Sequence, residues 1–255
     1  MPEIKRPDGT RIHYEVRGEG PPLLLTHGYA ATSRMWQPQL DSLSKNRQVI
    51  AWDMRGHGRS ACSADPAAYS LEACIGDMIA LLDHAEAPTA VAGGLSLGGY
   101  ISLAFRLAHP ERVRGLVLVD TGPGFRQDAA RERWNRGIAK IVGRLETQGL
   151  DYLDGLGAEV SAAEHDSVEG LILAAQRILT QDDARVIDSL PEVDVPTLVV
   201  VGANDRPYHA ASDYMAQKIA GARKAVIPEA GHAVNLHQPD RFDREILAFL
   251  ETIAA

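Results

Sequence analysis

The chain has 255 residues, of which 45% are hydrophobic and 24% are charged, as is typical of a folded globular protein. Its 26 lysines and arginines and 34 aspartates and glutamates give a formal net charge of −8 at pH 7. This balance argues against a general binder of nucleic acid or of anionic membranes, because such proteins need a basic surface. No apolar run approaches the roughly 18 residues that a membrane helix requires.

The two cysteines, Cys62 and Cys74, are too few for a disulfide framework and do not form a Cys-x-x-Cys pair. We therefore expect reduced thiols and no zinc site. No cluster of histidines and carboxylates has metal-ligand spacing, so no metal and no cofactor are expected. Residues 1–9 lack the apolar core of about 7–15 residues that a signal peptide carries, so the expected location is cytoplasmic.

The N-terminal residues alternate between apolar and polar side chains, which predicts half-buried strands. The turn signal Pro7-Asp8-Gly9 lies between them, so residues 3–6 and 10–17 predict a hairpin. The following runs are short and apolar throughout, as in strands covered on both faces of a parallel sheet. These runs are residues 22–26, 48–52, 90–95, 113–120, 197–202 and 224–227. Helical spacing between the runs, as in residues 71–82, predicts a doubly wound α/β fold.

Residues 122–190 interrupt this alternation with two helical stripes of apolar side chains and no strand pattern. We expect residues 1–121 and 191–255 to form the core, and residues 122–190 to form a helical cap. The cap would lie over the carboxyl ends of the strands, where open α/β sheets bind their ligands.

Two tryptophans are candidates for the wall of a substrate pocket under this cap. Trp134 is the largest apolar side chain on the first cap stripe, and Trp36 lies in a predicted helix whose packing is the alternative role. A basic stripe on the first cap helix, which includes Arg133 and Arg136, is either a solvated face or a means of attracting an anionic substrate.

The most informative motif is Gly94-Leu95-Ser96-Leu97-Gly98, at the junction of a predicted strand and an apolar helix. A serine on this sharp turn presents its hydroxyl above the sheet edge, and its neighbours must be small because strand and helix converge there. The pentapeptide alone is weak evidence, since an ordinary serine can also begin a helix. Its strand–turn–helix context predicts Ser96 as a nucleophile.

A serine hydroxyl needs a neighbouring base to act as a nucleophile at neutral pH. His232 follows the predicted strand 224–227, and Asp205 follows the predicted strand 197–202. Asp120, at the end of another strand, is the alternative acid. We favour Asp205 because it precedes His232 by one strand and one helix, and we then expect Asp120 to be a hydrogen-bonding neighbour.

The oxyanion that forms when Ser96 attacks a carbonyl group needs hydrogen-bond donors. The strand 22–26 leads into His27-Gly28-Tyr29, so the backbone N–H of Tyr29 is placed to face that of Leu97. Leu97 begins a helix, whose amino end adds partial positive charge.

Two further polar positions favour structural roles. We interpret His27 as a residue that stabilises the loop after its strand. Asp53 and Arg55 lie in a glycine-rich turn, which predicts a structural ion pair.

Five sequence pieces in this order resemble the α/β-hydrolase superfamily over nearly the whole chain. They are His27-Gly28, residues 53–60 (DMRGHGRS), residues 94–99 (GLSLGG), Gly202-x-x-Asp205 and Gly231-His232. The resemblance implies an eight-stranded, mostly parallel sheet with a helical cap. It also implies Ser96 as nucleophile, His232 as general base, Asp205 as orienting acid, and the amides of Tyr29 and Leu97 as oxyanion donors. The cap resembles those of small-ester esterases, enol-lactonases and cofactor-free haloperoxidases.

The expected function is therefore that of a serine hydrolase that cleaves small to medium carboxylic esters or lactones through an acyl-enzyme. The expected partner is a small-molecule substrate, with no nucleic acid and no membrane. Perhydrolysis, in which hydrogen peroxide replaces water, is the nearest alternative. A ligand receptor that uses the same pocket is an alternative of a different class, since fold alone does not decide function.

Overall fold

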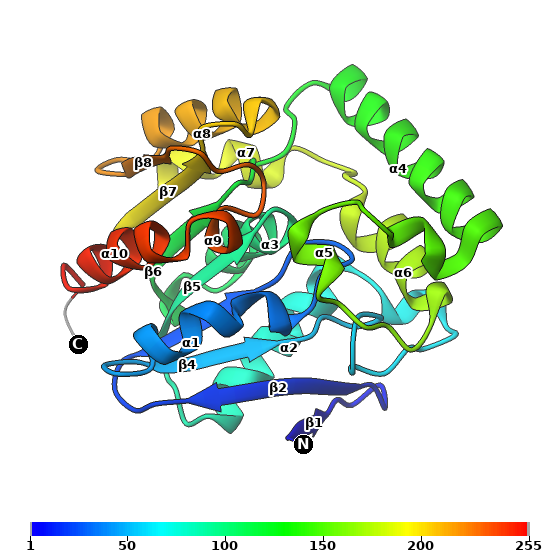
Figure 1. Cartoon of the computed structure of the whole chain (residues 1–255), viewed down its shortest axis with the longest axis horizontal. Coiled ribbons are helices and arrows are strands. Elements are labelled where there is room, and N and C mark those ends of the chain that lie inside the picture. The colour runs from blue at the N-terminus through cyan, green and yellow to red at the C-terminus, as the bar shows by residue number, and fades with distance from the viewer. Residues whose placement is uncertain (1, 254–255) are drawn as a thin grey trace.

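A computed structural model describes residues 2–253 and has an eight-stranded sheet at its centre (Figure 1). The strand order is β1-β2-β4-β3-β5-β6-β7-β8; the pairs β1–β2 and β2–β4 are antiparallel and the other pairs are parallel. The strands are β1 (Glu3–Lys5), β2 (Arg11–Arg17), β3 (Pro22–Thr26), β4 (Gln48–Trp52), β5 (Ala90–Leu95), β6 (Val113–Val119), β7 (Thr197–Gly202) and β8 (Arg223–Ile227).

The apolar runs of the sequence coincide with these strands. The N-terminal hairpin is confirmed, with Ile4 paired to Ile12. The predicted strand 113–120 ends one residue early, because Asp120 turns to a φ of 42°. The predicted α/β fold with a mostly parallel eight-stranded sheet is confirmed.

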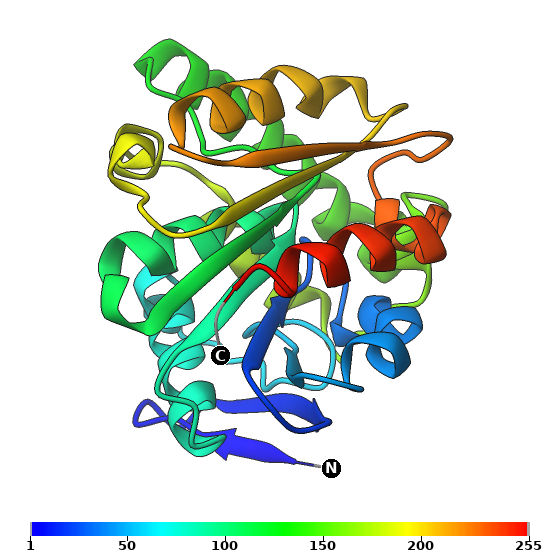
Figure 2. The same cartoon turned by 90° about the vertical axis from the view of Figure 1, so that its left-hand side faces the viewer.

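Helices cover both faces of the sheet and bury alternate strand residues against separate cores (Figure 2). Leu24 and Leu118 pack with α2 (Leu71–His84) and α3 (Leu97–Ala108) on one face. Leu23 and Leu25 pack on the other face. The helices there are α1 (Gln37–Leu43), preceded by the 3₁₀ turn Ser33–Trp36, and α10 (Pro239–Leu250). This alternation is why the strands are apolar throughout.

Trp36 belongs to this second core and not to a pocket wall. Its side chain is fully buried and stacks with Phe242 of α10, with ring centroids 6.2 Å apart. The expectation of Trp36 as a pocket residue is therefore wrong, because the helix that carries it lies against the sheet face.

The chain between β6 and β7 is helical, and we call residues 122–190 the cap segment. Three of its helices lie past one end of the strands of the sheet (Figure 1). They are α4 (Asp128–Gln148), which is the longest, α5 (Ala158–Ser161) and α6 (Val168–Ala174). A π-helical turn (Ala175–Leu179), α7 (Arg185–Asp188) and two 3₁₀ turns (Gly149–Leu153 and Leu190–Glu192) complete it. The core after β7 adds α8 (Arg206–Lys218) and α9 (Val234–His237); 3₁₀ turns lie at Pro66–Ala68 and Pro110–Arg112. Within residues 2–253, no helix is both long and apolar enough to span a membrane.

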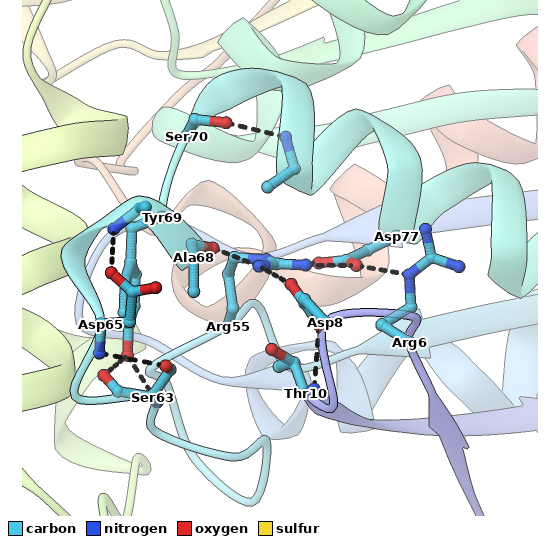
Figure 3. Close-up of polar contacts among 12 residues, drawn as sticks. Arg6, Asp8, Thr10, Arg55, Ser63, Asp65, Ala68, Tyr69, Ser70 and Asp77 are labelled. Atoms are coloured by element: carbon cyan, nitrogen blue, oxygen red, sulfur yellow. Dashed lines mark hydrogen bonds and ion pairs between the residues drawn. The ribbon is translucent and has the colours of Figure 1, made fainter.

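Arg55 and Asp53 do not pair with each other, so the expectation of a pair between the two is wrong. Each instead forms a structural ion pair with another residue, Arg55 with Asp77 and Asp53 with Arg59 (3.3 Å). Arg55 donates to both carboxylate oxygens of Asp77 on α2, at 2.7 and 2.8 Å, and to Asp8 at 3.0 Å (Figure 3). Asp53 instead accepts from the backbone N–H groups of Ser33 (2.7 Å) and Arg59 (3.0 Å). The turn directs the two side chains to different elements, and Arg55 thereby ties the N-terminal hairpin to α2.

The substitution Asp77→Asn should destabilise the fold by about 3 kcal/mol or more, because it leaves the Arg55 guanidinium buried beside a neutral group. The side chain of Asp77 is fully buried and that of Arg55 is 3% exposed. Urea unfolding would measure the loss. The matched control is Asp83→Asn on the same helix, which breaks an exposed pair with Arg112 and should cost at most about 1 kcal/mol. Equal effects of the two variants would contradict the prediction.

Candidate active site

Ser96 lies at the turn between β5 and α3 in a conformation that few non-glycine residues adopt, with φ 55° and ψ −117°. A Cβ atom at Gly94 would lie 2.3 Å from the carbonyl carbon of Gly98, and one at Gly98 would lie 2.3 Å from the carbonyl oxygen of Thr26, so strand and helix can approach only with glycine at both positions. Thr121 donates to the backbone oxygen of Ser96 at 2.6 Å and helps to hold the turn. The local geometry is that of a serine exposed on a strained strand-to-helix elbow.

His232 and Asp205, the predicted base and acid, are in contact. Nδ1 of His232 lies 2.8 Å from Oδ2 of Asp205. Because a carboxylate only accepts, this contact places the proton on Nδ1 and leaves the Nε2 lone pair free to act as a base. Asp205 is 6% exposed, so water screens its charge only weakly. Ser96 and His232 line the same cavity.

Asp120 is fully buried beside this pair. Its Oδ1 accepts the backbone N–H of Gly202 at 2.8 Å; its Oδ2 has no hydrogen-bond partner within residues 2–253, although the carboxyl group of Asp205 lies nearby. Burial, assisted by the charge of Asp205, raises the pKa of Asp120 to about 9. Asp120 is therefore protonated at pH 7, and its O–H can donate to Asp205.

Tyr208 is a neighbour of the pair that the sequence reasoning missed. It lies in the first turn of α8, three residues after Asp205, and its ring stacks on His232 with centroids 4.9 Å apart. Tyr208 and Ser96 also line the same cavity. Its position just after the predicted acid was the available signal, since the first turn of the helix after Asp205 must lie close to it.

The two residues predicted to donate to the oxyanion both lie near Ser96. Leu97 is the first residue of α3, and Tyr29 follows β3 in the loop that begins at His27. A Cβ atom at Gly28 would lie 3.5 Å from Cβ of Ser96, so this loop passes directly beside the serine. The ring of His27 stabilises the loop: its Nδ1 contacts the carbonyl of Gly28 at 2.6 Å, and its Nε2 accepts the backbone N–H of Met54 at 2.9 Å.

Two cavities meet at Ser96, with volumes of about 510 and 310 Å³. Phe125, Trp134 and Leu179, all from the cap segment, line both cavities and form a partition above the serine. The indole N–H of Trp134 donates to the carbonyl of Leu179 at 2.8 Å, which fixes the ring in this partition.

The larger cavity has mostly apolar walls, to which Ile138 and Ile141 of α4 contribute. Arg133 of the basic stripe also lines this cavity, although its side chain is exposed. Within residues 2–253, no group of three or more histidine, cysteine or acidic side chains could hold a metal ion.

Comparison with known proteins places this architecture in a family. The pattern of the alpha/beta hydrolase family matches residues 23–245. The chain is 32% identical over 255 residues to the pimeloyl-[acyl-carrier protein] methyl ester esterase of Nitrosomonas europaea, covering 91% of this chain and 96% of that protein. It is 27% identical over 257 residues to 3-oxoadipate enol-lactonase 2 of Acinetobacter baylyi, covering 94% and 93%.

Among solved structures, a thermophilic esterase from Thermogutta terrifontis superposes with a TM-score of 0.82 at 27% identity, over the full length of both chains. The match of the family pattern runs from β3 through β8 and so includes the parallel strands, the elbow and the cap segment. The chain therefore belongs to the alpha/beta hydrolase family.

Proposed function

We propose that this chain is a serine hydrolase of carboxylic esters or lactones, with Ser96 as nucleophile, His232 as general base and Asp205 as orienting acid. The observation that carries the proposal is the contact of Asp205 with Nδ1 of His232 in a cavity that opens on the strained turn at Ser96. Relatives that include a methyl ester esterase and an enol-lactonase favour this substrate class.

In the proposed mechanism, Nε2 of His232 takes the proton of Ser96 as its oxygen attacks the substrate carbonyl. The carbonyl π electrons move to oxygen, and the amides of Tyr29 and Leu97 stabilise that charge. The imidazolium then gives its proton to the leaving alkoxide, which departs as an alcohol. Water, deprotonated by His232, attacks the acyl carbon; the bond to Ser96 breaks, the imidazolium returns the proton to the serine oxygen, and the acyl group leaves as a carboxylic acid.

Asp205 holds the His232 ring in the tautomer that these steps need and stabilises its protonated form. Asp120, when protonated, would support Asp205 by turning its O–H toward that carboxylate, and would not compete with it for His232.

The two cavities suit the two parts of an ester substrate. The partition made by Phe125, Trp134 and Leu179 would keep the acyl group and the alcohol group apart on either side of Ser96. In this proposal residues 122–190 act as the cap, and the size and apolar walls of the larger cavity favour substrates of small to medium length.

The substitution Ser96→Ala should lower steady turnover of a chromogenic short-chain ester by at least about 1,000-fold, because the members of a triad act as a unit. Circular dichroism should show an unchanged fold. The matched control is Ser102→Ala, a buried serine on the same helix that lines neither cavity. If the Ser96 variant keeps more than about a tenth of the wild-type rate, the mechanism is wrong.

Asp205→Asn should lower kcat on the order of 10³- to 10⁴-fold, since the imidazole loses its orienting anion. Asp120→Asn should change kcat little, because asparagine can accept from Gly202 and donate to Asp205 as the protonated acid does. Steady-state kinetics of both variants would rank the two carboxyl groups. The opposite ranking would make Asp120 the catalytic acid.

The raised pKa of Asp120 also predicts that the stability of the fold depends on pH. Its folded pKa of about 9 lies above the ordinary value of 3.8, so the native state binds more protons than the unfolded state between these values. Stability from this group is complete below pH 3.8 and is lost as the pH rises toward 9. Urea unfolding from pH 4 to 9 should therefore show a shallower decline in Asp120→Asn than in the wild type. Parallel curves would contradict the assignment.

Trp134→Ala should alter substrate preference, because removal of the indole joins the two cavities above Ser96. We expect the ratio of kcat/KM for a long-chain over a short-chain acyl ester to rise, with a small change in melting temperature since the side chain is only half-buried. Arg136→Ala, on the exposed face of the same helix, is the control. An unchanged chain-length profile would remove Trp134 from the substrate pocket.

A further inference from the structure

A histidine of the cap segment contacts the loop that carries Tyr29. His165 lies between α5 and α6 (Figure 1); its Nε2 is 2.9 Å from the carbonyl of Ala30, and its Nδ1 is 3.0 Å from the backbone nitrogen of Gly58. A carbonyl only accepts and a backbone N–H only donates. The ring must therefore carry its proton on Nε2 and accept at Nδ1, so it bonds to both backbone groups only when neutral.

The loop beside Ser96 depends on contacts from outside itself. Ala30 has a φ of 58°, in the left-handed region that is unfavourable for alanine, and such a conformation persists only when its surroundings impose it. The hydroxyl of Tyr29 donates to the carbonyl of Leu171 on α6 at 2.9 Å. The cap segment thus contacts the loop at two consecutive residues, through Leu171 and through His165.

Two further histidine rings fill the space behind the loop. The ring of His57 lies 5.0 Å from that of His27, 5.6 Å from that of Tyr29 and 5.9 Å from that of His165, measured between centroids. Burial lowers the pKa of all three histidines, that of His27 to about 4. The rings are therefore uncharged near pH 7 and pack as a continuous layer from the cap segment to the loop.

The cap segment is also fixed in position next to this layer. The backbones of Gly56 and Gly170 approach so closely that a Cβ atom on either would lie 2.6 Å from the carbonyl oxygen of the other. Gly170 belongs to α6. The loop that contains His57 and Gly58 and the cap helix that follows His165 thus meet without side chains between them.

We propose that His165 is a positioning residue through which the cap segment holds the Tyr29 amide in the oxyanion hole. By donating to the carbonyl of Ala30, it fixes the backbone on the carboxyl side of Tyr29, while the Gly58 amide fixes the ring itself. The oxyanion hole then depends on a contact from the cap segment as well as on the core. This inference rests on the proposed function, because it assigns a support to the same site.

The test uses three substitutions that separate the two hydrogen bonds. The side-chain nitrogen of glutamine can take the place of Nε2 and donate to Ala30, whereas the side-chain oxygen of asparagine can take the place of Nδ1 and accept from Gly58. We expect His165→Asn and His165→Ala to lower kcat for a chromogenic ester about 10- to 100-fold, because small displacements of a catalytic donor have effects of this size. His165→Gln should retain most of kcat.

A transition-state analogue provides the second measurement. An alkyl boronic acid forms a tetrahedral adduct with the active-site serine, so its Ki should rise in the Asn and Ala variants by the factor lost in kcat, while KM changes much less. The control is Glu164→Gln in the same segment, which breaks only the exposed ion pair of Glu164 with Arg34 and should leave kcat and Ki unchanged.

Equal kcat in the Gln and Asn variants, or a loss confined to KM or to melting temperature, would overturn the inference. The comparison of Gln with Asn remains decisive if the Ala variant does not fold. Failure of the proposed function is distinguishable, because the wild type itself would then hydrolyse no ester and bind no boronic acid at Ser96.

Discussion

The close approach of β5, α3 and β3 is the constraint on which the rest of the site depends. A Cβ atom at Gly98 would lie 2.3 Å from the carbonyl oxygen of Thr26, just as one at Gly94 would meet Gly98. The start of α3 therefore lies directly against the carboxyl end of β3. These two close approaches bring the strained turn at Ser96 and the loop after β3 side by side, so that the proposed nucleophile and the proposed oxyanion loop are positioned together.

Parallel strands explain why so much of the site follows from the sequence. The carboxyl ends of such strands meet at one edge of the sheet, so polar residues just after buried apolar runs gather there. Ser96, Asp205 and His232 each follow such a run, and the structure places the last two in contact. The sequence could therefore predict that these residues, far apart in the chain, lie close together, because the end of each strand was recognisable.

Residues that themselves lie in turns and loops gave no such signal. Trp36 is a large aromatic residue of the kind that often lines pockets. Its 3₁₀ turn packs against the sheet face, however, and its ring stacks on Phe242. Arg55 pairs with Asp77, a carboxylate on a helix whose inward side looks apolar in the sequence pattern. His165 lies outside any helix or strand of the cap segment, so no periodicity indicates the direction of its ring. Such long-range contacts become visible only in three dimensions.

Four ionisable groups packed around the site, Asp120 and the three histidines His27, His57 and His165, share a further property, which is that burial favours their uncharged forms. Asp120 remains protonated, and burial lowers the pKa of His27, His57 and His165. A charge on any of them would alter the field in which the proposed oxyanion and imidazolium form, because charges interact strongly where water is excluded. Because these groups are neutral, they contribute directed hydrogen bonds and not charge. Asp120 can donate to Asp205, and in the proposal above the histidines orient the loop of Tyr29. Rigid dipoles of this kind stabilise developing charge without reorganising during the reaction. In the proposed function, the cap segment would therefore support catalysis without a charged residue at the reacting atoms.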